Sequence, residues 1–128
     1  MTTEDAVPNP GLVKLVPMEG KGRGVVALAA IAKGTLIDAT PVIRMKKKDR
    51  PSRRSILSHY PFEWNDPPYV EAFALGMAAL LNHSAKPNCR LEVDYEDEVI
   101  RIWTKKAIPA GTELTHDYGV EPWFDVEP

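Results

Sequence analysis

The chain has 128 residues, which is enough for one domain that buries a core without disulfide or metal staples. Its 44% hydrophobic and 27% charged residues exclude disordered and fibrous classes, and twelve prolines favour short strands joined by turns over a helical bundle. The formal net charge of -2 gives no overall attraction to nucleic acid, and the single cysteine excludes intramolecular disulfides and cysteine-cluster zinc sites.

The N-terminal segment and the cysteine content bear on location. Residues 1–5 lack the basic start and apolar run of a signal peptide, and no apolar stretch is long enough to span a bilayer. A lone cysteine fits a reducing compartment. We expect a soluble, intracellular protein that has no membrane partner. In a prokaryote it would be cytoplasmic, and in a eukaryotic or viral setting a nuclear location is also compatible with the sequence.

The first quarter of the chain predicts an arm, a strand and a glycine-rich loop. Residues 1–10 are expected to form a flexible arm, and residues 12–16 a strand that ends at Pro17. Three glycines alternate within residues 19–24, where backbone can approach a ligand closely or simply turn. The apolar run 25–31 looks like strand, so the loop is not a dinucleotide-binding fingerprint, which needs a long helix there.

A short internal repeat predicts two similar corners. Residues 30–35, Ala-Ile-Ala-Lys-Gly-Thr, recur as residues 107–112, Ala-Ile-Pro-Ala-Gly-Thr. Each copy should place its isoleucine in the core, its glycine at a positive φ and its threonine at the start of a strand. Two copies are too few for a solenoid.

The middle of the chain is less regular. Residues 46–54 are strongly basic and predict a solvated loop, with nucleic-acid contact as the alternative. Aromatic residues gather in residues 59–69 without a helical or strand period, so residues 46–69 look like a variable insertion whose rings cover a pocket or fill the core. The apolar spacing in residues 70–81 predicts one short helix, and residues 91–104 predict a hairpin.

Polar side chains follow the apolar segment 78–81 directly. Asn82 and His83 carry donors and acceptors that are costly to bury unpaired, and a ligand is one source of partners. Zinc binding by His83, Cys89 and His116 is disfavoured because the three residues follow no known ligand spacing. A Cys-His nucleophile pair is disfavoured for the same reason.

These motifs together resemble the SET-domain family of protein lysine methyltransferases. Residues 82–84 are Asn-His-Ser, Pro87-Asn88 follows, and residues 111–119 read Gly-x-Glu-Leu-x-x-Asp-Tyr-Gly. The resemblance covers residues 12 to 124 and is closest to small free-standing SET proteins of viruses and bacteria. It implies a mainly β, β-clip fold of several small sheets with a C-terminal pseudoknot, a domain over residues 11–119, and a segment 120–128 that closes the site.

The resemblance also implies roles for individual residues. S-adenosylmethionine would be approached by backbone of the glycine loop, its methionine part held by one amide side chain, and its adenine contacted by main chain and covered by a C-terminal aromatic. Three further side chains would form the pocket for the transferring methyl and the amine. The cofactor residues are Gly22, Arg23, Gly24, Asn82, His83, Tyr118 and Trp123, with Phe124 as the alternative to Trp123; the pocket residues are Tyr118, Tyr60 and His116.

Two departures from the family pattern matter. His116 stands where many relatives have Phe or Tyr, so the number of methyl groups added is not carried over. Its imidazole would either contact a water or the amine, or point to solvent. The cysteine-rich zinc segments that flank many chromatin SET domains are absent from this sequence, so no metal is expected.

The implied activity is methyl transfer from S-adenosylmethionine to a lysine ε-amine in a basic protein or peptide, such as a histone tail or ribosomal segment. Acidic residues within 92–98 and 121–127 would attract such a substrate, or are merely solvated. The alternative is a catalytically inactive SET-fold module that binds peptide or cofactor. A nucleic-acid partner is disfavoured, and a homodimer that completes the peptide groove is compatible with the sequence.

Overall fold

The computed structural model describes residues 11–117, which form nine strands and three short 3-10 helices. None of these helices is long and apolar enough to cross a membrane. The helices are η1 (Lys47–Asp49), η2 (Ile56–His59) and η3 (Met77–Ala79). The strands are β1 (Val13–Met18), β2 (Gly22–Ala27), β3 (Leu36–Lys46), β4 (Phe62–Asp66), β5 (Tyr69–Ala74), β6 (Asn82–His83), β7 (Cys89–Asp94), β8 (Val99–Thr104) and β9 (Glu113–His116).

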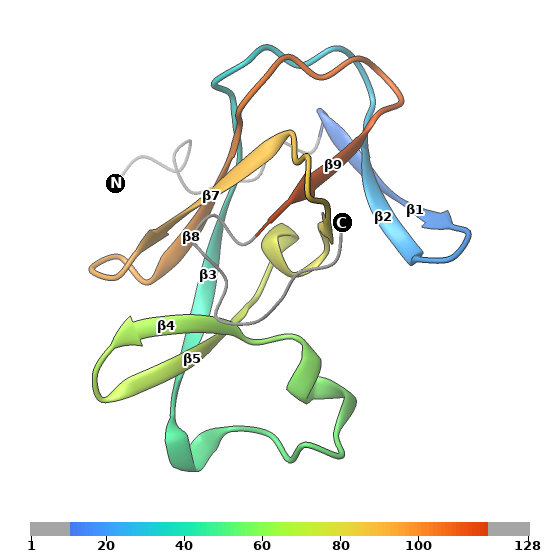
Figure 1. The fold of residues 1–128 in the computed structure, drawn as a ribbon. Helices are drawn as coiled ribbons and strands as arrows, with labels where there is room; N and C mark the ends of the chain where they lie inside the picture. Colours follow the sequence, from blue (N-terminus) through green and yellow to red (C-terminus); the bar gives the residue numbers. More distant parts are fainter. Residues whose placement is uncertain (1–10, 118–128) are drawn as a thin grey trace.

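The strands form two small sheets, as expected for the predicted fold. One has the order β1-β2-β9-β6 and the other β4-β5-β3-β8-β7. The 11-residue β3 pairs with β8 over residues 36–41 and with β5 over residues 42–46. Figure 1 shows how this long strand connects the β4–β5 hairpin to the β7–β8 hairpin. The paired strands are antiparallel except for β6 and β9, which run parallel.

The two repeated corners are built alike and bond to each other. The backbone nitrogens of Ile31 and Ile108 each donate to the other residue's carbonyl oxygen, at 2.8 and 2.9 Å. Both side chains are buried. Gly34 and Gly111 have φ of +80° and +81°, in the left-handed region that glycine adopts without strain. The repeat prediction is confirmed, since the corners lead into β3 and β9.

The helix predicted over residues 70–81 is wrong for most of its length. Its first part is β5, in which Ala72 and Ala74 are buried while Phe73 faces the other way. Antiparallel pairing with β3 over this segment overrides the helical propensity of its alanines. Within residues 70–81 only η3 is helical, and this single turn leads to Asn82.

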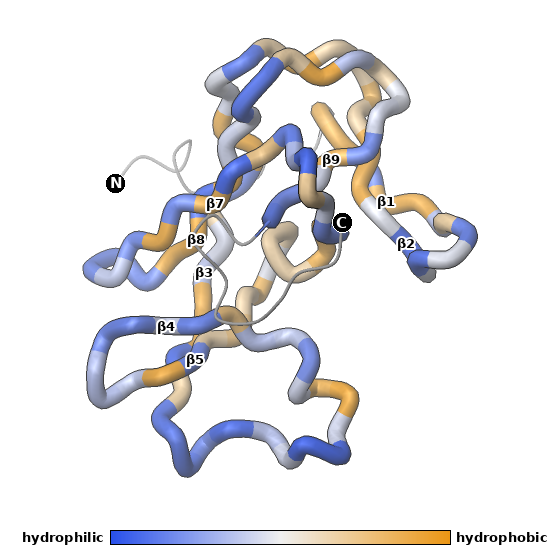
Figure 2. The backbone as a smooth tube through the Cα atoms, in the orientation of Figure 1, coloured by the Kyte–Doolittle hydropathy of each residue, from blue (hydrophilic) through white to orange (hydrophobic). Residues whose placement is uncertain are grey.

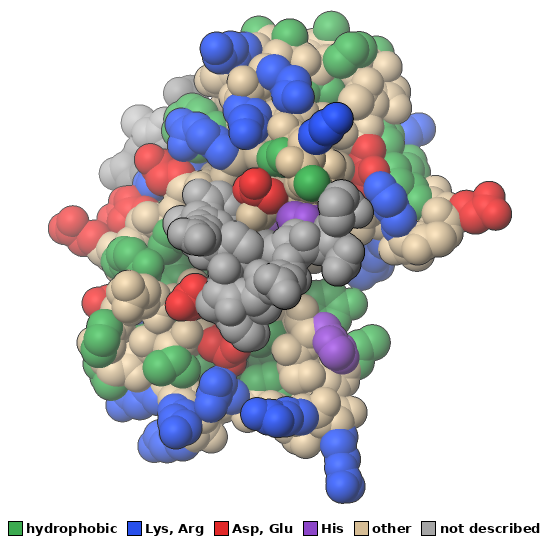
Figure 3. All heavy atoms as spheres, in the orientation of Figure 1, with side chains coloured by type: hydrophobic (Ala, Val, Ile, Leu, Met, Phe, Trp, Pro, Cys, Tyr) green, Lys and Arg blue, Asp and Glu red, His purple; other side chains and the backbone are tan. Residues whose placement is uncertain are grey.

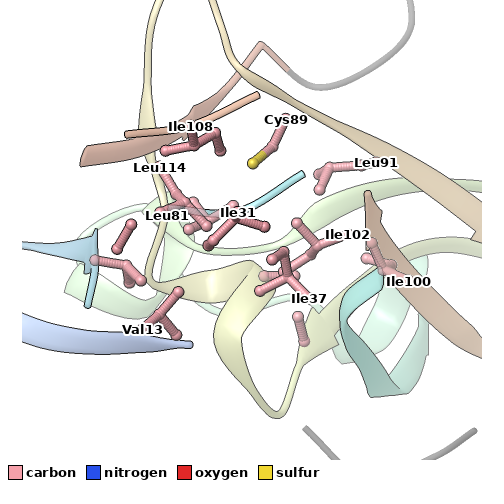
Figure 4. Packing of buried hydrophobic residues seen from close by; sticks show 14 of the residues in the cluster. Val13, Ile31, Ile37, Leu81, Cys89, Leu91, Ile100, Ile102, Ile108 and Leu114 are labelled. Atoms are coloured by element: carbon pink, nitrogen blue, oxygen red, sulfur yellow. The ribbon is translucent and has the colours of Figure 1, made fainter. Parts of the chain in front are cut away.

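The core lies where the corners and both sheets meet. Ile37, Ile102 and Leu114 are fully buried and come from three different strands. Figure 4 shows them converging with Ile31 and Leu81. Since Leu81 is only 7% exposed, it anchors the chain immediately before the polar pair at positions 82 and 83.

The basic run 46–54 lies on the surface. All six of its lysines and arginines are exposed, as the solvated-loop interpretation predicts. Figure 2 shows a hydrophilic stretch of chain after β3, and Figure 3 shows lysine and arginine side chains along that edge of the molecule. The strand predicted to end at Pro17 extends one residue further, to Met18.

Candidate functional site

A cavity of about 570 Å³ lies beside the β1–β2 turn, the segment before β4 and the segment η3–β6. Its volume is typical of small-molecule sites, which run from roughly 300 to 1,000 Å³. Six of the residues predicted for the site line this one cavity. They are Gly22, Arg23, Tyr60, Asn82, His83 and His116.

A buried carboxylate on β3 holds the turn that leads into the cavity. Asp38 is 3% exposed, and its Oδ2 accepts hydrogen bonds from the Met77 backbone nitrogen at 3.0 Å and from Thr40 Oγ1 at 2.7 Å. Thr40 Oγ1 in turn accepts from the Ala78 backbone nitrogen at 3.2 Å. Two backbone N–H groups at the start of η3 are therefore hydrogen-bonded by side chains of strand β3.

The Asn-His-Ser segment lies directly beside the Glu-Leu-x-x segment, as the resemblance implies. In the parallel β6–β9 pair, Asn82 lies opposite Thr115 and His83 opposite His116. The side chain of Asn88 fixes the same strand, since its Nδ2 donates to Glu113 O at 2.8 Å and its Oδ1 accepts from Thr115 N at 2.9 Å. The expected pseudoknot threading of the chain after β9 falls outside the described residues 11–117, and so does Tyr118.

Asn82 is the centre of the polar wall of the cavity. Its Nδ2 donates to Arg23 O at 2.9 Å and to Glu113 Oε2 at 2.6 Å. The other oxygen of Glu113 pairs with Lys21 Nζ at 2.7 Å. One amide thus joins the glycine loop to β9, which explains why segments far apart in sequence form one site.

Positions 22 and 24 of the loop favour glycine for different structural reasons. Gly22 has φ of +79°, which side chains rarely adopt, and a Cβ there would meet open space. Gly24 has no such φ, but a Cβ would lie 2.6 Å from Met18 Sδ, 2.7 Å from Glu113 Oε2 and 2.9 Å from Asn82 Nδ2. A side chain at position 24 would therefore have to displace the side-chain ends that form the polar wall.

His116 is buried in the cavity wall rather than directed to solvent. Its side chain is 4% exposed, and its ring centre lies 6.1 Å from that of Phe62. Burial lowers the pKa of His116 to about 4, and the neighbouring His83 adds to the lowering. The alternative of a solvent-facing imidazole is wrong, and the ring is neutral near pH 7.

Tyr60 and the aromatic cluster occupy different depths. Tyr60 lines the cavity but is 45% exposed, so it lies at the rim. Trp64 is 1% exposed and packs edge-on against Tyr95 at a centroid distance of 4.9 Å. The cluster therefore serves both functions left open by its sequence, with Tyr60 at the pocket and Trp64 in the core. Trp123 lies outside the described residues.

Cys89 is not placed for chemistry. Its side chain is 1% exposed, and burial raises the pKa of the thiol to about 12. Within residues 11–117, no three His, Cys, Asp or Glu side chains are grouped as metal ligands.

The acidic residues of the β7–β8 hairpin are engaged with an arginine. Arg101 contacts Asp94 at 2.8 Å, Asp97 at 3.4 Å and Glu92 at 3.6 Å. The backbone N–H of Asp97 and the Arg101 guanidinium lower the pKa of Asp94. One guanidinium offsets only one of these three negative charges, so the hairpin keeps a negative surface that could still attract a basic peptide.

The sequence gives no signal for the contacts that Glu113 makes with Asn82 and Lys21. Glu113 belongs to the Glu-Leu-x-x-Asp-Tyr motif, so its position was visible, but its contact with Asn82 joins residues 31 positions apart. Lys21 belongs to the glycine-rich loop, and its ion pair with Glu113 joins residues 92 positions apart. Neither contact has a local signal in the sequence.

Known proteins are similar to this chain in sequence. The SET domain family model matches residues 22–119. A histone-lysine N-methyltransferase of Schizosaccharomyces pombe, named as H3 lysine-37 specific, is 32% identical over 111 residues, 85% of this chain and 74% of that protein. The Arabidopsis thaliana histone-lysine N-methyltransferase ASHH1 is 32% identical over 120 residues, 87% of this chain but only 24% of the relative.

A solved structure agrees in fold. The crystal structure of a Plasmodium falciparum protein superposes with a TM-score of 0.73 at 24% identity, covering 88% of this chain and 97% of that one. The family match spans most of the chain, including the cavity residues on β2, β6 and β9. The chain belongs to the SET-domain family of protein-lysine N-methyltransferases.

Proposed function

We propose that this protein transfers a methyl group from S-adenosylmethionine to the ε-amine of a lysine in a basic protein. The observation that carries the proposal is that the glycine loop, Asn82, His83, Tyr60 and His116 line one and the same cavity. Methylation of protein lysine from this cofactor is the general activity of the family. The particular substrate and the turnover of this chain belong to the proposal.

The residues of the cavity fit the cofactor. Its volume of about 570 Å³ suits a nucleoside joined to an amino acid. Lys21 and Arg23 supply positive charge for a carboxylate, and Asn82 supplies an amide for the methionine part. We assign the adenine to main-chain groups at His83 and to the ring of Trp123, and the backbone approach to Gly22 and Gly24.

The protein's contribution to the reaction is alignment and exclusion of water. When bound, S-adenosylmethionine supplies a methyl group on a sulfonium, which is already a good leaving group. Phe62, Leu80 and the neutral His116 line the cavity, and a poorly solvated wall favours the uncharged form of an incoming lysine amine. We assign Tyr118 to orient the methyl group through weak C–H···O contacts of its hydroxyl.

Histone-like substrates are favoured by the names of the relatives. The S. pombe proteins similar to this chain are named for lysine 37 and lysine 36 of histone H3. We propose a lysine in a histone-like or ribosomal basic segment as the target. The three acids around Arg101 share one positive charge, so the β7–β8 hairpin stays negative and would add electrostatic attraction for a basic segment.

A methyl-transfer assay tests the function. The protein would be incubated with radiolabelled S-adenosylmethionine and mixed histones or ribosomal proteins, and the labelled lysine identified by mass spectrometry. Tyr118→Phe should reduce transfer far more than it weakens cofactor binding, while Asn82→Ala should weaken binding itself. Cofactor binding without transfer to any protein would support the inactive-module alternative and contradict the enzymatic proposal.

A further inference from the structure

The orientation of the Asn82 amide is dictated by its neighbours. Its Nδ2 lies 2.9 Å from Arg23 O and 2.6 Å from Glu113 Oε2. A carbonyl oxygen and an ionised carboxylate accept hydrogen bonds but cannot donate them. A flipped amide would place its oxygen against both of these acceptors and lose both bonds. The NH₂ group must therefore face Arg23 and Glu113.

The same orientation leaves the amide oxygen for a ligand. Both hydrogens of Nδ2 are used, and within residues 11–117 no group donates to Asn82 Oδ1. This oxygen is also not among the buried side-chain atoms that lack a partner in the described part of the chain. Because Asn82 lines the cavity, the site offers an acceptor there.

Glu113 is itself held firmly. Lys21 Nζ binds its other oxygen at 2.7 Å, and Asn88 fixes its backbone by donating to Glu113 O at 2.8 Å. Gly24 leaves room for the carboxylate, since a Cβ there would lie 2.7 Å from Glu113 Oε2. The Glu113 side chain is 17% exposed, so water competes little for the bond to Asn82.

We propose that Glu113 is a positioning residue that locks the Asn82 amide with its oxygen toward the cavity, so that the site selects a ligand with an ammonium donor at that point. The inference rests on the proposed function, in which this donor is the α-ammonium of the cofactor's amino-acid part. A carboxylate at the same point would face the Asn82 oxygen and the Glu113 charge, and is directed instead to Lys21 and Arg23.

The test compares two ligands by isothermal titration calorimetry. S-adenosylhomocysteine carries the α-ammonium, and its desamino analogue lacks only that group. The wild-type protein should bind S-adenosylhomocysteine roughly 10- to 100-fold more tightly, the range for a hydrogen bond to a charged group. In Glu113→Gln the new amide can donate to Asn82 Oδ1 and permit the flip, so the preference should fall to about threefold or less.

A matched variant separates positioning from loss of charge. Glu92→Gln removes a carboxylate that pairs with Arg101, outside the residues lining the cavity, and should keep the wild-type preference. If Glu113→Gln does not fold, Glu113→Asp keeps the charge but shortens the reach and should also lose the preference. A general loss of stability would weaken the binding of both ligands equally and leave the ratio of their affinities unchanged.

The binding results distinguish failure of the Glu113 inference from failure of the proposed cofactor. A wild-type protein that binds both ligands equally would overturn the role of Glu113 while leaving the methyltransferase proposal standing. The same holds if Glu113→Gln retains the full preference. If the wild type binds neither ligand, the proposed cofactor fails, and the positioning inference fails with it.

Discussion

The carboxylate of Asp38 accepts a hydrogen bond from the backbone nitrogen of Met77 at 3.0 Å, which joins the long strand β3 to the turn leading into the cavity. The group is 3% exposed. Asp38→Ala should lower the free energy of unfolding by about 1–3 kcal/mol, because it leaves a buried N–H unsatisfied.

Urea denaturation measures this loss, and Asp49→Ala is its matched control. Asp49 also accepts a backbone N–H, that of Lys46 at 3.1 Å, but in an exposed loop. Water can replace the carboxylate there, so the control should cost at most about 0.5 kcal/mol. Equal losses in the two variants would show that the Asp38 contact is not structurally important.

Protonation of His116 should destabilise the fold in acid. Burial lowers the pKa of His116 in the folded protein to about 4 from the ordinary value of 6.5, so below pH 6.5 the unfolded chain binds the proton more readily than the folded one. The stabilising contribution is complete above pH 6.5 and is lost as pH falls through about 4. With roughly 1.4 kcal/mol per pKa unit, the upper limit is about 3.5 kcal/mol.

The free energy of unfolding measured from pH 4 to pH 7.5 checks this dependence. His116→Phe removes the titrating group and should flatten the curve between pH 4 and 6.5. His59→Gln removes an exposed histidine and should keep the wild-type slope. A wild-type slope in His116→Phe would assign the dependence to other groups.

Gly24→Ala should disturb both stability and the site. The new Cβ would lie within 3 Å of Met18, Glu113 and Asn82 side-chain atoms, of which the latter two form the polar wall. Overpacking of this kind costs about 1–3 kcal/mol. Thermal denaturation and S-adenosylhomocysteine affinity should both decrease. Gly11→Ala, where a Cβ meets nothing within 4 Å, should leave both unchanged.

Truncation of a corner isoleucine should be costly. Ile108 is 1% exposed, so Ile108→Ala leaves a cavity in the core and should lose about 2–5 kcal/mol of unfolding free energy. Ile56→Ala makes the same chemical change at a residue that is 69% exposed and should cost less than about 0.5 kcal/mol. Denaturant titration distinguishes the two, and similar losses would contradict the assigned core.

Cys89 should react with alkylating reagents only after unfolding. The thiol is buried, and its pKa is raised to about 12, so almost no thiolate is present at pH 8. Iodoacetamide labelling followed by mass spectrometry should be slow in native buffer and fast in urea. Rapid labelling of the folded protein would show that the Cys89 thiol is not buried.

Local patterns in the sequence predict much of the fold. The alternation in residues 91–104 indicates the β7–β8 hairpin, because one face of each strand packs on the core. The paired copies of Ala-Ile-x-x-Gly-Thr indicate two corners, because glycine and isoleucine have definite conformational and burial preferences. Neither pattern shows that Ile31 and Ile108 bond to each other.

The remaining features depend on contacts between distant segments. The apolar side chains of residues 70–81 have helical spacing, but pairing with β3 makes the first part of this segment a strand. The sequence leaves open whether His116 faces solvent, because its burial comes from Phe62 and from its pairing opposite His83. Motif spacing brings Asn82 to the cavity, but only the fold shows that Glu113 sets its orientation.

Strand β9 lies between β2 and β6, and this arrangement has a consequence for the order of assembly. The glycine loop and the Asn-His segment both pair with β9, and they touch each other directly through the bond from Asn82 to Arg23, so neither wall of the cavity is complete until residues 113–116 insert. A chain emerging from the ribosome can close its hairpins early, since those contacts are local. Ligand binding must await the last of these strands, and any ligand present at that moment would favour the inserted state.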